Sequence, residues 1–145
     1  MGLLHLCDEH PAAVGTKATA AEAIQLMLEH RVGGVTVVDD DGVVAGIFTE
    51  RDVLRKLVLS GRDQAKTPVA ELMTAPVILA TPAMTPGEAF HIMIERHFRH
   101  LPLVDDRGRL IAMLSIRHLL QWRVDDLTGR LDAMEQYITN DAPGG

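Results

Sequence analysis

The chain has 145 residues, 47% of them hydrophobic and 23% charged, and a formal net charge of −6 at pH 7. This length suits one compact domain or two small units that share a core. The net negative charge does not favour binding to nucleic acid, and no apolar run is long enough to span a membrane. Cys7 is the single cysteine, which excludes an intramolecular disulfide. We therefore expect a protein of the reducing cytoplasm with no nucleic-acid or membrane partner.

The first elements follow a weak candidate strand at 12–14. Thr19 and Glu22 form a capping-box pattern that predicts a helix over 20–31. Its apolar residues fall on one face at helical spacing: Ala23, Ile24, Met27 and Leu28. A β-rich run at 35–38, an acidic turn ending in Gly42 and a second run to Phe48 then indicate a hairpin.

A second helix is predicted to start at Thr49, which is a favourable N-cap, and to end near Gly61. Gly33 and Gly34 allow close approach of a ligand, or they end the first helix. The polar segment 60–68 is the expected joint to the rest of the chain.

The same pattern returns after an offset of 66 residues. Between 19–54 and 85–120 the ungapped alignment holds 11 identities in 36 positions. The second copy begins with a candidate strand at 77–79 and a capping box from Thr85 to Glu88, which predicts a helix over 86–97. A hairpin of 101–104 and a run to Leu114 follows, and Ser115 caps a further helix.

Beyond the repeat, apolar residues continue at spacings of three and four: Leu120, Val124, Leu127, Leu131, Met134 and Ile138. They predict an amphipathic helix that extends past the second unit, followed by a frayed tail at 141–145. The stripe could pack on its own unit, pair with a second chain or dock another protein. A helix of this length overhangs a small unit, so we favour a homodimer.

The expected fold is therefore α+β: two β-α-β-β-α units packed by pseudo-twofold symmetry, with an extended C-terminal helix. Neither unit buries enough surface to be stable alone at about 60 residues. We place the first unit at 1–62, the second at 63–126 and the C-terminal helix and tail at 127–145.

The segment from Gly46 to Asp52, Gly-Ile-Phe-Thr-Glu-Arg-Asp, follows the acidic turn and enters a helix. Together with the repeat, it resembles the tandem CBS-domain (Bateman) module over nearly the whole chain. The resemblance implies a regulatory module, not an enzyme, that binds AMP, ADP, ATP, a dinucleotide or S-adenosylmethionine between its units. It requires no cofactor, and its output is a conformational change that acts on an unidentified regulated protein.

A helix start with a free hydroxyl and unpaired N–H groups favours phosphate, and a carboxylate one turn later can accept both ribose hydroxyls. Thr49 and Asp52 take these roles by resemblance, although the same pair is also an ordinary N-cap arrangement. The second copy has His118 where the first has Asp52, so we expect one competent site and one weaker or empty site. The candidate ligand-binding residues are Gly34, Val35, Gly46, Thr49, Arg51, Asp52, Arg99, His100, Leu101, Pro102, Ser115, Arg117 and His118.

Three rival interpretations remain. A metal site could use His91, His97, His100 and His118, or His5, Cys7 and His10, but neither set has a known ligand spacing, and no metal is expected. An enzyme would need a nucleophile elbow, a phosphate loop or a recurring catalytic pair, and the sequence contains none of these. The third alternative is a ligand-free platform for dimerisation or interaction.

Overall fold

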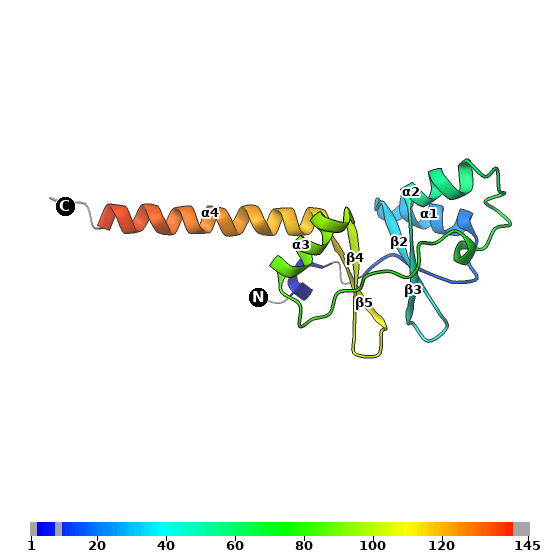
Figure 1. The fold of residues 1–145 in the computed structure, drawn as a ribbon, viewed down its shortest axis with the longest axis horizontal. Coiled ribbons are helices and arrows are strands. Elements are labelled where there is room, and N and C mark those ends of the chain that lie inside the picture. The colour runs from blue at the N-terminus through cyan, green and yellow to red at the C-terminus, as the bar shows by residue number, and fades with distance from the viewer. Residues whose placement is uncertain (1–2, 8–9, 141–145) are drawn as a thin grey trace.

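The computed structural model describes residues 3–7 and 10–140 and contains two small α+β units side by side, with one long helix leaving the second (Figure 1). The first unit comprises β1 (Ala13–Gly15), α1 (Ala20–His30), β2 (Gly34–Val38), β3 (Val44–Thr49) and α2 (Glu50–Asp52). The second comprises α3 (Pro86–Arg96), β4 (His100–Val104), β5 (Leu110–Ser115) and α4 (Ile116–Asn140). The predicted fold class is confirmed. The tail predicted at 141–145 lies outside the described residues.

Both capping boxes form as predicted. The hydroxyl of Thr19 accepts the N–H of Glu22 at 3.2 Å, and that of Thr85 accepts the N–H of Glu88 at 3.1 Å. Each helix then ends in a residue with left-handed backbone, Arg31 (φ 55°) or its equivalent in the second copy, His97 (φ 58°). Gly33 and Gly34 therefore do not end the first helix.

The buried face of each of these helices is narrower than the apolar stripe predicts. Ala23 and Met27 of α1 are buried, but Leu28 is 69% exposed, and its equivalent in α3, Ile94, is 53% exposed. The expectation that Leu28 faces the core is wrong, and Ile94 of α3 is exposed in the same way. A residue directly after Met27 is rotated about 100° around the helix axis, beyond the line that touches the sheet.

The leading strands also differ from expectation. In the first unit the weak candidate strand forms β1, which pairs parallel with β2. Strand β3 pairs antiparallel with the other edge of β2 and completes the sheet. In the second unit the strand expected at 77–79 is absent, and one isolated bridge joins Ala80 to Leu103 beside antiparallel β4 and β5. The N–H of Thr36 donates to the carbonyl of Ala12 in the first unit. The equivalent position is Pro102, which has no N–H to donate.

The second helix of the first unit changes character after one turn. Residues Val53–Val58 have π-helical hydrogen bonding, and a turn leads to Gly61, whose φ is +69°. The predicted end near Gly61 is therefore confirmed. π-helical turns within helices are frequent at functional sites, and this one begins directly after Asp52.

Each unit has its own apolar core, and the cores exchange short segments. The turn η1 (Leu3–Leu6) contributes Leu3, which has no exposed surface, to the core of the second unit. The equivalent turn η3 (Val69–Glu71) contributes fully buried Val69 to the core of the first. The chain that precedes each unit therefore packs on the other one, so neither core closes without both halves of the sequence.

The two hairpin turns join the units directly, on one side of the molecule (Figure 1). The carboxylate of Asp39 accepts the N–H groups of Asp41 and Val43, and Asp105 does the same for Arg107 and Arg109. The hydrogen bond from the backbone N–H of Arg109 is the main cause that lowers the pKa of the Asp105 carboxyl. Desolvation opposes it, and the N–H of Arg107 and the charges of both arginines reinforce it. These turns hold Val43 and Arg109 opposite each other in an antiparallel bridge.

No helix in the described part of the chain has both the length and the hydropathy needed to cross a membrane.

Candidate functional site

The strongest sequence candidate, Thr49 with Asp52, sits where β3 enters α2. Thr49 has an extended backbone (φ −119°, ψ 168°), and its hydroxyl accepts the N–H of Asp52 at 3.3 Å. The Asp52 carboxylate returns the contact through Oδ2, which accepts the N–H of Thr49 at 3.0 Å and its hydroxyl at 3.2 Å. Asp52 is only 5% exposed. The pair therefore forms a complete, buried capping box.

Two further residues, which were not predicted from the sequence, contact the other oxygen of the Asp52 carboxylate. Oδ1 of Asp52 accepts the hydroxyl of Thr74 at 2.8 Å and lies 3.3 Å from Nζ of Lys56. Lys56 is one turn along the same helix, a spacing that could have suggested the ion pair. Thr74 lies in the connection between the units and carried no local signal. Its backbone bonds to Ile47 in both directions bring it beside β3.

Gly46, a proposed ligand contact, is buried beneath this connection. A methyl group on Gly46 would lie 2.6 Å from the sulfur of Met73 and 2.8 Å from the carbonyl oxygen of Thr74. Only glycine allows the connecting chain to approach β3 so closely. Met73 and Thr74 therefore occupy the space that a side chain at position 46 would fill.

The glycine pair of the first unit meets the basic pair of the second across the junction. A methyl group on Gly34 would lie 3.6 Å from Nδ1 of His100, and one on Gly33 would lie 3.5 Å from Cε1 of the same ring. The Glu50 carboxyl carbon is equally near, 3.7 Å from the Gly33 position. The ring of His100 thus lies over the backbone of Gly33–Gly34, and the junction brings together residues that are far apart in sequence.

His100 is partly buried at this junction. Desolvation lowers the pKa of the His100 imidazole below its ordinary value of 6.5, the charge of Glu50 opposes that effect, and Arg99 and His118 reinforce it. The neutral ring is therefore favoured at pH 7. A neutral imidazole can donate one hydrogen bond and accept another.

The second copy keeps the cap but not the carboxylate. The hydroxyl of Ser115 accepts the N–H of His118 at 3.3 Å, as Thr49 does for Asp52. Nδ1 of His118 is buried and has no hydrogen-bond partner among the described residues. The equivalent of Asp52 in the second copy therefore cannot supply a ribose acceptor of the same kind.

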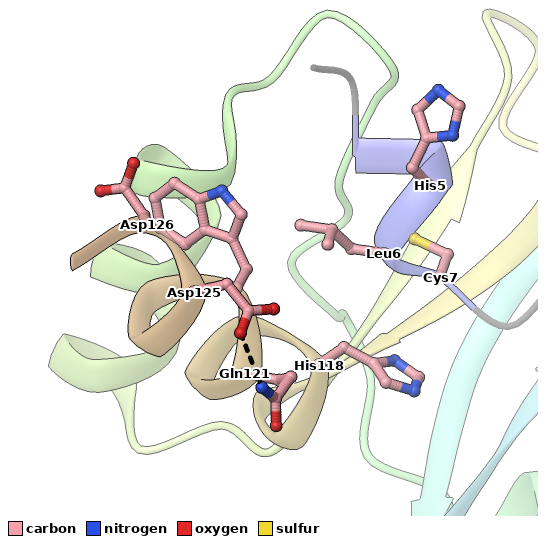
Figure 2. Close-up of a pocket in the computed structure, with 8 residues that line it drawn as sticks. His5, Leu6, Cys7, His118, Gln121, Asp125 and Asp126 are labelled. Atoms are coloured by element: carbon pink, nitrogen blue, oxygen red, sulfur yellow. Dashed lines mark hydrogen bonds between the residues drawn. The ribbon is translucent and has the colours of Figure 1, made fainter. Parts of the chain in front are cut away.

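His118 also lines a pocket of about 470 Å³ between η1 and α4 (Figure 2). The pocket is lined by His5, Leu6, Cys7, His118, Gln121, Trp122, Asp125 and Asp126. Figure 2 shows the rings of His5 and His118 pointing away from each other. No three metal-ligating side chains gather into a cluster in residues 3–7 and 10–140, so neither histidine set is assembled there.

The remaining candidates divide by burial. Arg51, Arg99 and Arg117 are exposed, as solvated or ligand-facing guanidinium groups would be. Val35, Leu101 and Pro102 are buried in β2 and β4, where they can contribute backbone and packing but no open surface. Equivalent backbone bonds fix the helix starts: the N–H of Glu50 donates to Gly33, and that of Ile116 donates to Arg99.

Two repeated α+β units, joined by equivalent hairpins and with helix starts at their junction, define a tandem module of the Bateman type. The family model for the CBS domain matches twice, at residues 5–59 and 69–125. The chain therefore belongs to the CBS-domain family, and the resemblance seen in the sequence is confirmed.

Similar proteins agree with this assignment. The mitochondrial CBS domain-containing protein CBSX3 of Arabidopsis thaliana is 34% identical over 85% of this chain, which spans 61% of the length of that relative. The structure of a protein with CBS domains from Burkholderia ambifaria is 38% identical, with a TM-score of 0.74 over 81% of this chain and 85% of that one. CBSX2 in complex with AMP has a TM-score of 0.70 at 24% identity, covering 82% of this chain and 91% of its own.

Proposed function

We propose that this chain is a regulatory module, without catalysis, that binds an adenosyl ligand at the junction of its two units. The ligand class includes AMP, ADP, ATP, a dinucleotide and S-adenosylmethionine, and the proposed compartment is the cytoplasm. The observation that carries the proposal is the position of His100 over Gly33–Gly34. It brings the basic pair Arg99–His100 of the second copy to the glycine pair Gly33–Gly34 of the first copy. The AMP complex of CBSX2 supports the same ligand class.

The residue roles follow from the chemistry of each group. Thr49 lies at a helix start, where the positive end of the helix dipole favours a phosphate, although the N–H groups of Glu50 and Asp52 there already donate to Gly33 and Thr49. The exposed Arg99 guanidinium, next to His100, supplies positive charge at the same junction. Asp52 is the proposed ribose acceptor. The site around Ser115 and His118 is the weaker one because it has no carboxylate.

Ribose binding at Asp52 requires an exchange of hydrogen bonds. The two carboxylate oxygens offer about four acceptor positions, and four donors from Thr49, Thr74 and Lys56 already occupy them. Lys56 is 42% exposed and flexible, so its ammonium group is the donor that a sugar hydroxyl displaces most readily. Thr74 is the second donor that can yield. The ligand would then hold the connection between the units in a new position.

The proposed output is a change in the relative arrangement of the two units. A ligand can shift this arrangement only by its difference in affinity for the two states. The exchanged segments and the paired hairpins couple both units to any movement at the junction. The division at 1–62, 63–126 and 127–145 stays a proposal about the sequence units, since the cores exchange residues across it.

Calorimetric and thermal-shift titration with AMP, ADP, ATP, diadenosine phosphates and S-adenosylmethionine tests the function, because a bound ligand stabilises the folded state by mass action. We expect one of them to bind the wild type, Asp52→Ala to abolish that binding, and His118→Ala to leave it nearly unchanged. Thr74→Val frees Oδ1 of Asp52 without removing the carboxylate, so it should bind at least as tightly as the wild type. Equal binding by Asp52→Ala removes the ribose role, and no binding by the wild type removes the function.

A second candidate function is a platform for dimerisation. The C-terminal stripe on α4 supports it, because its apolar side chains from Leu120 to Ile138 are 45–63% exposed. This candidate requires no ligand. A regulated partner protein would then recognise the dimer and not a ligand-bound form.

A further inference from the structure

Helix α4 extends far beyond the unit in which it starts (Figure 1). Leu119, in its first turn, has no exposed surface and belongs to the second core. The helix meets α3, β5 and η1 near this end. All described side chains from Leu127 to Ile138 are exposed. At 1.5 Å per residue, the segment from Leu127 to Asn140 projects roughly 20 Å.

A projecting helix of this length is not stable by itself. Isolated helices shorter than about 12–15 residues are marginal in water, and most helical stability in proteins comes from packing. Arg123 and Arg130 form ion pairs with Asp126 on the same helix, at 3.4 Å each, but such pairs contribute only a few tenths of a kcal/mol. Gly129, in the middle of the segment, weakens the helix further. The apolar stripe of α4 therefore needs a partner.

The stripe follows a strict heptad pattern. Counting from Leu120, successive apolar residues are 4, 3, 4, 3 and 4 positions apart. Heptad positions a are Val124, Leu131 and Ile138, and positions d are Leu120, Leu127 and Met134. A strict seven-residue repeat produces a left-handed supercoil of helices. Two of the three a positions hold β-branched residues, and two of the three d positions hold leucine. β-branched residues at a with leucine at d favour two parallel strands.

The flanking charges select the direction of the partner. Position g is occupied by Arg123, Arg130 and Tyr137, and position e by Gln121, Thr128 and Glu135. In a parallel pair, residue g of one helix faces residue e five positions later on the other, so Arg130 meets Glu135 of the second copy. In an antiparallel pair, g faces g, which brings arginines together. The pattern is therefore complementary to itself only in parallel.

We propose that α4 pairs with α4 of a second copy of this chain as a parallel, in-register, two-stranded coiled coil over residues 120–138. This arrangement covers the whole stripe and places both modules at the same end of the coil. The inference specifies the partner and geometry of the dimerisation candidate, and it is independent of ligand binding.

The oligomeric state gives the first test. Light scattering and sedimentation equilibrium should find a dimer for the wild type and for Gln136→Lys, which lies on the opposite face of α4. Leu131→Lys, at a central a position, should raise the dimer dissociation constant by at least about 100-fold, because a charge replaces buried leucine in both strands. A monomeric wild type, or a Leu131→Lys protein that is as dimeric as Gln136→Lys, overturns the proposal.

Disulfide formation tests the direction. In a Cys7→Ser background, Leu120→Cys places a cysteine at the first d position and Ile138→Cys places one at the last a position, at the two ends of the stripe. Position d faces d and a faces a in a parallel pair, whereas a faces d in an antiparallel pair. A parallel, in-register pair brings each cysteine to its own copy, so each variant should form a covalent dimer under mild oxidation. An antiparallel pair gives a covalent dimer only when the two variants are mixed. That result would overturn the proposed geometry while leaving the dimer and the ligand-binding function intact.

Discussion

Val44 and Leu110 occupy equivalent positions in the two copies, and each donates its backbone N–H to the turn glycine of the other copy at 3.0 Å. The acceptors are the carbonyl groups of Gly108 and Gly42, respectively. Between these bonds, Val43 bridges Arg109. The two hairpins thus form a small pseudo-symmetric junction that needs no side chain, and each turn must hold its carbonyl in position for the other unit.

Alanine at either turn glycine should weaken this junction. Gly42 and Gly108 have φ values of +82° and +80°, which cost an L-residue about 1–2 kcal/mol and would turn the carbonyl away from its donor. The control is Gly61→Ala, where φ is +69° but no atom of the other unit is near. Urea denaturation should show a larger loss of stability for Gly42→Ala and Gly108→Ala than for Gly61→Ala. Equal losses would mean that the junction contributes nothing beyond local strain.

Gly46→Ala should destabilise the protein through the connection between the units. Its methyl group would overlap the backbone of Thr74, which cannot move without weakening the Thr74 bond to Asp52. We expect a loss of about 1–3 kcal/mol in the free energy of unfolding. Gly87→Ala, in the first turn of α3 with the nearest side-chain atom 4.0 Å away, should be neutral or stabilising. An unchanged Gly46→Ala protein would show that the 73–74 segment is free to shift.

Stability should rise with pH in the range where His100 titrates. The pKa of the folded-state imidazole is lowered, chiefly by burial. The unfolded chain therefore binds more protons below about pH 6.5, and stability is lost as pH falls through that value toward the folded pKa. Melting temperatures between pH 5 and 7.5 should show a smaller slope for His100→Gln than for the wild type. Identical slopes in the two proteins would refute the assignment.

Gly129→Ala should stabilise α4. Gly129 is exposed within the helix, and an added methyl group meets nothing within 4 Å. Glycine costs a helix interior about 0.5–1 kcal/mol relative to alanine. Circular dichroism should show more helix and a higher melting temperature for Gly129→Ala. The reverse change nearby, Ala133→Gly, should have the opposite effect, and a decrease in helicity for Gly129→Ala would indicate that the glycine has a packing role.

Part of the candidate site was readable from single positions. Thr49, Asp52 and Ser115 were placed correctly at helix starts because a cap depends on residues three positions apart. Gly34 and His100 were expected separately as ligand-binding candidates, and the sequence did not predict that they meet across the junction. Thr74 could not be found, because nothing in its local sequence indicates that it reaches Asp52, 22 residues away.

The sequence by itself determined the repeat, both capping boxes, the hairpin turns and the length of α4, because these features follow from short-range hydrogen bonding and from periodicity. Only the tertiary structure decided which surfaces the elements cover. Leu3 entered the opposite core, Leu28 stayed exposed, and Pro102 prevented a strand that its neighbours favoured. Such outcomes depend on contacts between residues far apart in the chain, and local pattern carries no information about them.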